Sequence, residues 1–332
     1  MKKIVFDILN NDGGHFKALD AALKFKNENP NYQLTLVGPA NIIKEYLKKN
    51  TNKFEIFDSN GLAHIENSPR EILKNQSTML DAFNFLNENE YDAILSSGDS
   101  GSLISLSSLK VKRLPNVARP AFMPMIPTIN NKYILLLDAG ANVETPSEYL
   151  NNWSLVATEY YKKIFNIQKP TVGLLNIGTE EYKGSNNIKE ANHLLKDNTL
   201  INYQGFIEPK DAIEGKVDIV LAEGQIGNIF LKTLESSFIG FGRVLKQTIM
   251  SSCISKIGGL FLKPKLKKMK QRFDYRNVGG AYIVGLEKVV VKAHGSSDKI
   301  AFYNALNQIK NLLEKNNFIE DIKSNLGAIN NE

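Results

Sequence analysis

The sequence predicts an α/β fold in which helices cover a mainly parallel sheet. Three observations support this prediction. Short apolar runs recur along the chain, they do not alternate with polar residues, and helix-like stretches lie between them. Continuous apolar runs are typical of strands buried on both faces, and alternation of such strands with helices is typical of parallel sheets.

Each predicted strand ends in Gly, Asp or another small polar residue. The predicted strands are residues 4–7, 34–38, 93–98, 133–140, 172–178, 219–224 and 289–295. The clearest predicted helices are residues 16–27, 78–87, 147–165, 188–196 and 299–314, and Asp298 is the expected N-cap of the last one. Ligands of such folds bind beyond the carboxyl ends of the strands, so the polar ends of these runs form the predicted site.

One segment, residues 236–275, contains no strand pattern. Its first half has apolar residues at spacing four from Phe241 to Ile257, and its second half has a 4-3-4 spacing from Leu262 to Phe273. We predict a helical hairpin with a bend near residues 258–264 and a basic second helix. Its apolar faces exceed what a small insertion needs, which favours a dimer contact; the alternative is packing of both helices on the body.

The positive charge is concentrated in that same segment. The net charge is +6, and residues 263–276 alone carry seven basic residues and one acid, which sum to +6. This distribution argues against a generally nucleic-acid-binding protein and favours a local basic surface facing an acidic partner or a membrane. The alternative is a solvated, lysine-rich helix face. The single cysteine, Cys253, fits a reducing compartment, and with no signal peptide or membrane span expected the predicted location is the cytoplasm.

Two loops after predicted strands have the composition of anion sites. Residues 176–186 contain Gly178, Lys183 and Gly184, and the glycines would let backbone N–H groups approach an anion that the lysine attracts. The order differs from a Walker A loop, because Lys183 precedes Gly184. Residues 223–228 contain Gly224 and Gly227 before a predicted helix, together with an asparagine, Asn228, that either donates to an oxyanion or caps that helix.

Two further turns add polar groups. Residues 292–298 place His294, Ser296, Ser297 and Asp298 in one strand-to-helix turn. Residues 96–102 include a Gly-Asp-Ser-Gly segment that is similar to the nucleophile segment of trypsin-like proteases, but the α/β pattern and single cysteine exclude that β-barrel class. A helix-start turn that contributes the hydroxyl of Ser100 is the preferred interpretation. No Gly-x-Gly-x-x-Gly follows the first strand and no Cys/His spacing suggests zinc.

Taken in order, these loops resemble one family. The segments YILLLDAGANV (133–143), VGLLNIGTEEYKG (172–184), Gly-Asn at 227–228 and KAHGSSD (292–298) resemble the motifs of the bacterial acyl-carrier-protein:phosphate acyltransferases (PlsX). The resemblance is strong over residues 90–310 and weak before them. It implies a three-layer, Rossmann-like α/β/α fold of the isocitrate dehydrogenase and phosphate acetyltransferase type, with residues 1–332 forming one catalytic domain and residues 236–275 a protruding hairpin.

The resemblance also implies a reaction and its residues. A long-chain acyl group passes from acyl carrier protein to inorganic phosphate, giving acyl phosphate for phospholipid synthesis, with no cofactor or metal. Lys183 would hold the phosphate and Asn228 would donate to the oxyanion. His294 would complete the anion cradle or shuttle a proton. The other residues implied to bind phosphate are Asp7, Ser100, Gly178, Gly184, Gly224, Gly227, Ser296 and Ser297.

Partners follow from the same resemblance. It implies a homodimer, and a downstream glycerol-3-phosphate acyltransferase is a further expected partner. The hairpin would contact the inner face of the membrane or the acidic carrier protein. The expected contact residues are Ile257, Leu260, Phe261, Lys263, Lys265 and Lys267.

Departures from the family pattern keep two alternatives open. Asn10 and Asn11 replace paired glycines of the first loop, Asp99 replaces an asparagine, and Glu223 and Gln225 stand where Asp and Phe are usual. These changes are compatible with a non-catalytic or weakly active membrane-associated paralogue. A short-chain phosphate acetyltransferase of the same fold is the other alternative.

Overall fold

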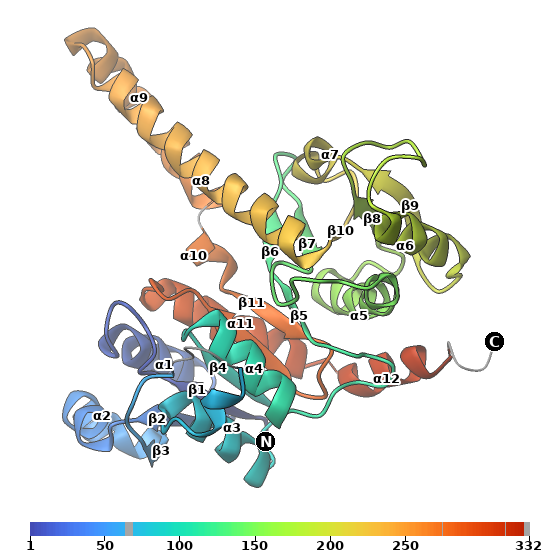
Figure 1. Cartoon of the computed structure of the whole chain (residues 1–332). Helices are drawn as coiled ribbons and strands as arrows, with labels where there is room; N and C mark the ends of the chain where they lie inside the picture. Colours follow the sequence, from blue (N-terminus) through green and yellow to red (C-terminus); the bar gives the residue numbers. More distant parts are fainter. Residues whose placement is uncertain (64–68, 274, 316, 329–332) are drawn as a thin grey trace.

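The strands of this chain form two sheets, each within its own lobe (Figure 1). The computed structural model describes residues 1–63, 69–273, 275–315 and 317–328. Residue 274, inside the predicted hairpin range, therefore lies outside the described residues.

The larger sheet has seven strands in the order β3-β2-β1-β4-β12-β11-β5. Five neighbouring strands, from β3 to β12, run parallel, while β11 is antiparallel to both of its neighbours. The strand bounds are Glu55–Asp58 (β3), Gln33–Gly38 (β2), Lys3–Asp7 (β1), Ala93–Ser96 (β4), Val289–Ala293 (β12), Gly280–Val284 (β11) and Ala121–Met123 (β5).

The smaller sheet has five strands in the order β6-β7-β10-β8-β9. Only β6 is antiparallel to its neighbour. The strand bounds are Met125–Pro127 (β6), Tyr133–Leu137 (β7), Ile219–Leu221 (β10), Thr171–Leu175 (β8) and Asn202–Ile207 (β9).

Helices follow most of the strands and cover the sheets. The α-helices are Phe16–Glu28 (α1), Ala40–Leu47 (α2), Thr78–Glu88 (α3), Ser100–Lys110 (α4), Ser147–Phe165 (α5), Asn186–Asp197 (α6), Pro209–Glu214 (α7), Gly224–Ile249 (α8), Cys253–Arg272 (α9), Tyr275–Val278 (α10), Lys299–Leu313 (α11) and Phe318–Ala328 (α12). Short 3₁₀ turns span Lys48–Lys53 (η1) and Pro69–Leu73 (η2). One cluster of buried side chains includes Ile4 of β1, Leu137 of β7 and Tyr282 of β11, so both sheets border a common core.

The predicted α/β class is confirmed, and so are all seven predicted strands and all five predicted helices. The sequence predicted one sheet, whereas the structure has two. An apolar run indicates that a strand is buried on both faces, but it does not indicate which strands are its neighbours. The number of sheets therefore could not be predicted. Asp298 caps α11 as predicted, because its Oδ1 accepts from the backbone N–H groups of Ile300 and Ala301, each at 3.0 Å.

The predicted hairpin exists, but its predicted bend near residues 258–264 is wrong. Those residues lie inside α9, and the chain turns instead between Ile249 and Cys253. A side chain at Gly259 would come within 2.4 Å of Ile249 Cγ2, so the glycine lets the two arms approach closely rather than ending a helix. The break has a local cause, since Ser252 and Ser255 form a capping box that starts α9.

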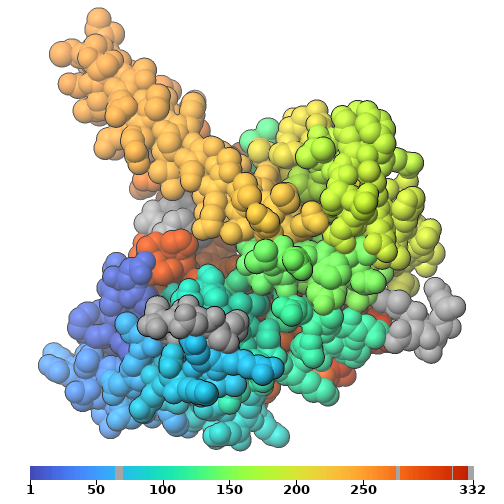
Figure 2. Space-filling model, in the orientation of Figure 1, coloured from blue at the N-terminus to red at the C-terminus, as the bar shows by residue number. Residues whose placement is uncertain are grey.

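The hairpin projects away from both lobes as an arm (Figures 1 and 2). Its first helix, α8, begins just after β10, the central strand of the smaller sheet, and only Gly224 and Gly227 of that helix are buried. No helix among the described residues is long and apolar enough to span a bilayer.

Candidate active site

The start of α8 is fixed against the loop that follows β7. Asp138 lies at the base of this loop with its carboxylate buried, and it accepts hydrogen bonds from the backbone N–H groups of Phe122, Ala141 and Asn142 at 2.9, 3.1 and 2.8 Å. Burial raises the pKa of the Asp138 carboxyl, and these hydrogen bonds oppose the shift. The carboxylate therefore organises the turn on which α8 rests.

Gly224 and Gly227 allow α8 to approach that turn. A Cβ on Gly224 would lie 2.0 Å from the carbonyl oxygen of Asn142, and one on Gly227 would lie 2.0 Å from that of Asp138. Any side chain at either position would collide with backbone. Both glycines are buried, and their lack of a side chain is what lets the helix and the loop approach each other closely.

Asn228 is the fifth residue of α8, about one turn into the helix, at the edge of this packed region. Its side chain is half-buried and lies so close to Gly140 that a Cβ there would be 2.9 Å from Asn228 Cγ. Gly140 has φ 109°, a conformation that favours glycine. Gly140 thus leaves room for the Asn228 amide about one turn from the positive end of the helix dipole, a suitable position for an oxyanion donor.

Lys183 lies in the loop that joins β8 to α6. Its Nζ is 2.8 Å from Glu180 Oε1, and its aliphatic stem lies over Gly178, where a Cβ would be 2.6 Å from Lys183 Cδ. The hydrogen bond from Lys183 lowers the pKa of the Glu180 carboxyl. Gly184 has φ 96°, and Asn176 Nδ2 donates to the carbonyl of Lys183 at 3.1 Å, which fixes the loop.

The predicted residues His294, Ser296 and Ser297 lie together in the turn after β12. His294 Nδ1 lies 2.8 Å from Ser296 Oγ and accepts from the Ser296 backbone N–H at 3.2 Å. An Nδ1 that accepts from a backbone amide carries no proton itself, so in the neutral form of His294 the proton is on Nε2. Ser297 is fully buried, and its hydroxyl has no hydrogen-bond partner among the described residues.

Asp7 is a buried hub rather than an exposed ligand. Its carboxylate accepts hydrogen bonds from Thr78 Oγ1 and Ser96 Oγ, each at 2.7 Å, and from Asn10 Nδ2 at 2.8 Å. Burial raises the pKa of the Asp7 carboxyl, and these bonds oppose the shift. We therefore assign Asp7 to holding the loop after β1. Ser100 is exposed at the first position of α4.

Two departures from the family pattern have local explanations. The Nδ2 group of Asn10 donates to Asp7 and to Thr78, and its Oδ1 accepts from the backbone N–H of Ala63 at 3.1 Å. Both ends of the Asn10 amide are therefore hydrogen-bonded. Asp99 caps α4 by accepting from the Ser102 backbone N–H at 2.7 Å. Both residues therefore support the loops in which they stand.

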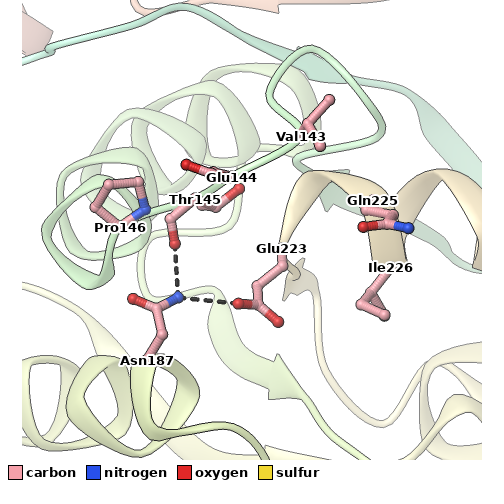
Figure 3. A pocket seen from close by; sticks show the side chains of 8 residues that line it. All are labelled: Val143, Glu144, Thr145, Pro146, Asn187, Glu223, Gln225 and Ile226. Carbon is pink, nitrogen blue, oxygen red and sulfur yellow. Dashed lines mark hydrogen bonds between the residues drawn. The ribbon is translucent and has the colours of Figure 1, made fainter.

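The structure adds a hollow that the sequence did not predict. It measures about 490 Å³ and lies beside the start of α8, where Asn187 Nδ2 donates to the Thr145 carbonyl at 2.6 Å and to Glu223 Oε1 at 3.0 Å (Figure 3). Its lining is Val143, Glu144, Thr145, Pro146, Asn187, Glu223, Gln225 and Ile226. Lys292, the penultimate residue of β12, is half-buried, and burial lowers the pKa of its ammonium group, which the sequence alone did not indicate.

Solved structures with this architecture define the class of fold. A phosphotransacetylase from Streptococcus pyogenes superimposes with a TM-score of 0.62 at 17% identity, covering 93% of each chain. A branched-chain phosphotransacylase from Enterococcus faecalis gives a TM-score of 0.55 at 15% identity, covering 94% of this chain and 99% of that one. The chain thus has the phosphotransacetylase type of α/β fold that the motifs implied.

Sequence comparison then gives the family. Residues 2–320 match the family model described as "Fatty acid synthesis protein". A phosphate acyltransferase from Mycoplasma mobile is 42% identical over 326 residues, covering 97% of this chain and 99% of the relative. One from Bacillus pumilus is 35% identical over 315 residues, covering 94% of each. The chain belongs to this fatty acid synthesis protein family, and the family expected from the motifs is confirmed.

Proposed function

We propose that this protein is a phosphate acyltransferase that moves a long-chain acyl group from acyl carrier protein to inorganic phosphate. The observation that carries the proposal is the identity of 42% with a phosphate acyltransferase over nearly the whole of both chains. The product, an acyl phosphate, would supply phospholipid synthesis, in which a glycerol-3-phosphate acyltransferase is the expected consumer.

The chemistry requires a phosphate oxygen to attack a thioester carbonyl carbon. A C–O bond forms and the carbonyl becomes a tetrahedral oxyanion; the oxyanion then collapses, the C–S bond breaks and the thiol leaves with one proton. Much of the barrier in such a reaction is the cost of bringing an anion and a thioester into line, so positioning is the main task of the protein.

Lys183 and Asn228 fit the two parts of this task. The half-buried Asn228 amide, about one turn from the start of α8, is suited to donate to the developing oxyanion. The ammonium of Lys183 is suited to hold phosphate and would exchange its contact with Glu180 for one with the substrate. His294 with Ser296 and Ser297 would border the phosphate from the larger sheet.

The hairpin supports the proposed membrane or carrier contact. Ile257, Leu260 and Phe261 of α9 have 59%, 66% and 81% of their surface exposed, and Lys263, Lys265 and Lys267 are exposed beside them. Apolar side chains next to lysines are typical of helices that lie on anionic lipid. We infer a cytoplasmic protein that associates with the inner face of the membrane and forms a homodimer through the remaining apolar hairpin surface. That residues 1–332 act as one catalytic domain remains a prediction.

The alternatives make different predictions. A non-catalytic paralogue is disfavoured because Asn10 and Asp99 are accommodated by local hydrogen bonds. A short-chain phosphate acetyltransferase is favoured only by the shared fold, and it would turn over acetyl-coenzyme A faster than long-chain acyl carrier protein.

The decisive experiment incubates the full chain with palmitoyl-acyl carrier protein and inorganic phosphate and measures acyl phosphate. We expect turnover that falls on the order of a hundredfold in Lys183→Ala and in Asn228→Ala, because each removes a group used on the reacting atoms. Circular dichroism of both variants controls for folding. A well-folded wild-type protein that gives no acyl phosphate would refute the proposal.

A further inference from the structure

The inference concerns how Lys183 and Asn228 are held relative to each other, and it rests on the proposed function. Lys183 lies in the loop before α6, and Asn228 lies near the start of α8. In the proposed reaction the phosphate held by Lys183 must meet a carbonyl whose oxygen is bound by Asn228. A misplacement of about 1 Å can slow such a reaction on the order of a hundredfold, so the two helix starts have to be fixed relative to each other.

The side chain of Asn187 connects those two helix starts (Figure 3). Asn187 is the second residue of α6, and its Nδ2 group donates to the Thr145 carbonyl at 2.6 Å and to Glu223 Oε1 at 3.0 Å. An amide NH2 group has two hydrogens, so both are used in these bonds. Because Glu223 is the N-cap residue of α8, the second bond joins the start of α6 directly to the start of α8.

Thr145 is itself part of the start of α8. Its Oγ1 accepts from the backbone N–H of Gly224, the first residue of that helix, at 3.0 Å, and Thr145 is buried. Thr145 therefore caps α8 from another segment of the chain. Asn187 thus holds α8 at two points, once through Glu223 and once through the residue that caps the helix.

The side chains of Asn187 and Glu223 are not used to cap their own helices. The N-cap of α6 is Ser185, whose Oγ accepts from the Ile188 backbone N–H at 3.2 Å. Glu223 makes no side-chain capping bond to α8, a helix that the structure describes throughout. Local helix formation therefore does not account for the bond between Asn187 and Glu223, and its effect is to join two helices.

The loop that carries Lys183 is mostly exposed. Between Ile177 and Asn186 only Gly178 is buried. At its entry the loop is held by Asn176, whose Nδ2 donates to the Lys183 carbonyl at 3.1 Å. At its exit, the first residue of α6 is followed directly by Asn187, four residues beyond Lys183. A bond from Asn187 to α8 therefore relates this exposed loop to the helix that bears the oxyanion donor.

We propose that Asn187 is a positioning residue, which sets the place of Lys183 relative to Asn228 by joining the start of α6 to the start of α8. It acts through the two helix starts rather than on the reacting atoms. Its loss should lower kcat, because the phosphate and the oxyanion donor are no longer aligned. The KM for phosphate should change little, because Lys183 itself is kept.

The first test exchanges donor and acceptor. In Asn187→Asp a carboxylate faces both the Glu223 carboxylate and the Thr145 carbonyl, so two repulsive contacts replace two hydrogen bonds. We expect kcat to fall roughly tenfold or more. Adding Glu223→Gln returns an N–H donor to the pair, and kcat should then recover several-fold. The matched control is Asn186→Asp, the same substitution at the exposed neighbouring residue, which should keep the wild-type kcat.

The comparison of kcat with stability separates a positioning role from a merely structural one. A bond that only stabilises the fold would lower the melting temperature and leave the kcat of the folded protein unchanged, and that result would overturn the inference. A loss of kcat in Asn187→Asp that Glu223→Gln does not relieve would overturn it too. If Asn187→Asp does not fold, Asn187→Leu, which removes both donors without adding a charge, allows the same measurement of kcat and KM.

Failure of the parent proposal is recognised from the wild type. Acyl phosphate is measured with the full chain, palmitoyl-acyl carrier protein and inorganic phosphate. No acyl phosphate from the folded wild type would refute the acyltransferase proposal. Wild-type turnover with the same kcat in Asn187→Asp and Asn187→Leu would refute the positioning role alone.

Discussion

The two ends of α8 are built in opposite ways. At Gly224 and Gly227 the helix is packed so tightly against the Asp138 loop that a single added methyl group would meet backbone at 2.0 Å. At the far end α8 packs against α9, which has no buried residue and exposes apolar side chains from Ile254 to Leu262. The difference indicates that one continuous helix joins a rigid region near the reaction to an arm free to contact something else.

The largest expected effect is at the packed end. Gly227→Ala should destabilise the protein by about 3 kcal/mol and abolish activity, since backbone must move to admit the methyl group. Gly242→Ala is the matched control, because a Cβ added there, on the same helix, would meet no other described residue within 4 Å beyond the adjoining backbone. It should stabilise the protein by about 0.5–1 kcal/mol through helix propensity. Urea denaturation of both variants measures the contrast, and equal effects would show that the packing argument is wrong.

A change at the free end should affect association and leave stability alone. We expect Leu260→Ser combined with Phe261→Ser to reduce binding to vesicles of anionic phospholipid several-fold, because both side chains are more than half exposed and apolar. The melting temperature should stay within error of the wild type. Vesicle co-sedimentation provides the measurement, and unchanged binding would remove these residues from the proposed membrane contact.

The smallest expected effect is a titration in the Lys183 loop. The pKa of Glu180 is lowered by its hydrogen bond from Lys183, so the interaction is present above the ordinary pKa of Glu180 and is lost as pH falls through the lowered one. In Lys183→Ala the pKa of Glu180 should rise back towards its ordinary value, because the hydrogen bond that lowers it is gone. Carbon-detected NMR of the Glu180 carboxyl measures this. An unchanged pKa would mean that the pair is not formed in solution.

The helix bounds, the helix cap and the positions of the loops could be predicted from the sequence, because each depends on residues close together in the chain. Residues 147–165 were predicted as a helix with the bounds that α5 has, and Asp298 was predicted to cap α11. The loops bearing Lys183, Asn228 and His294 were placed after strands because glycine and polar residues end apolar runs. The hairpin bend was misplaced because Gly258, Gly259 and Pro264 favour a break, yet Gly259 serves close packing of α8 and α9.

The sequence by itself determined the α/β class, the strands and helices, the family motifs and the side chains offered at each strand end. Those properties follow from hydrophobic periodicity and turn chemistry, which act over a few residues. Only the tertiary structure decided that the strands divide into two sheets, that Asp138 holds the start of α8, and that Lys292 is half-buried beside Ser96 of the neighbouring strand. These depend on which distant segments become neighbours, and burial among neighbours is what gives a charged side chain its pKa and its partner.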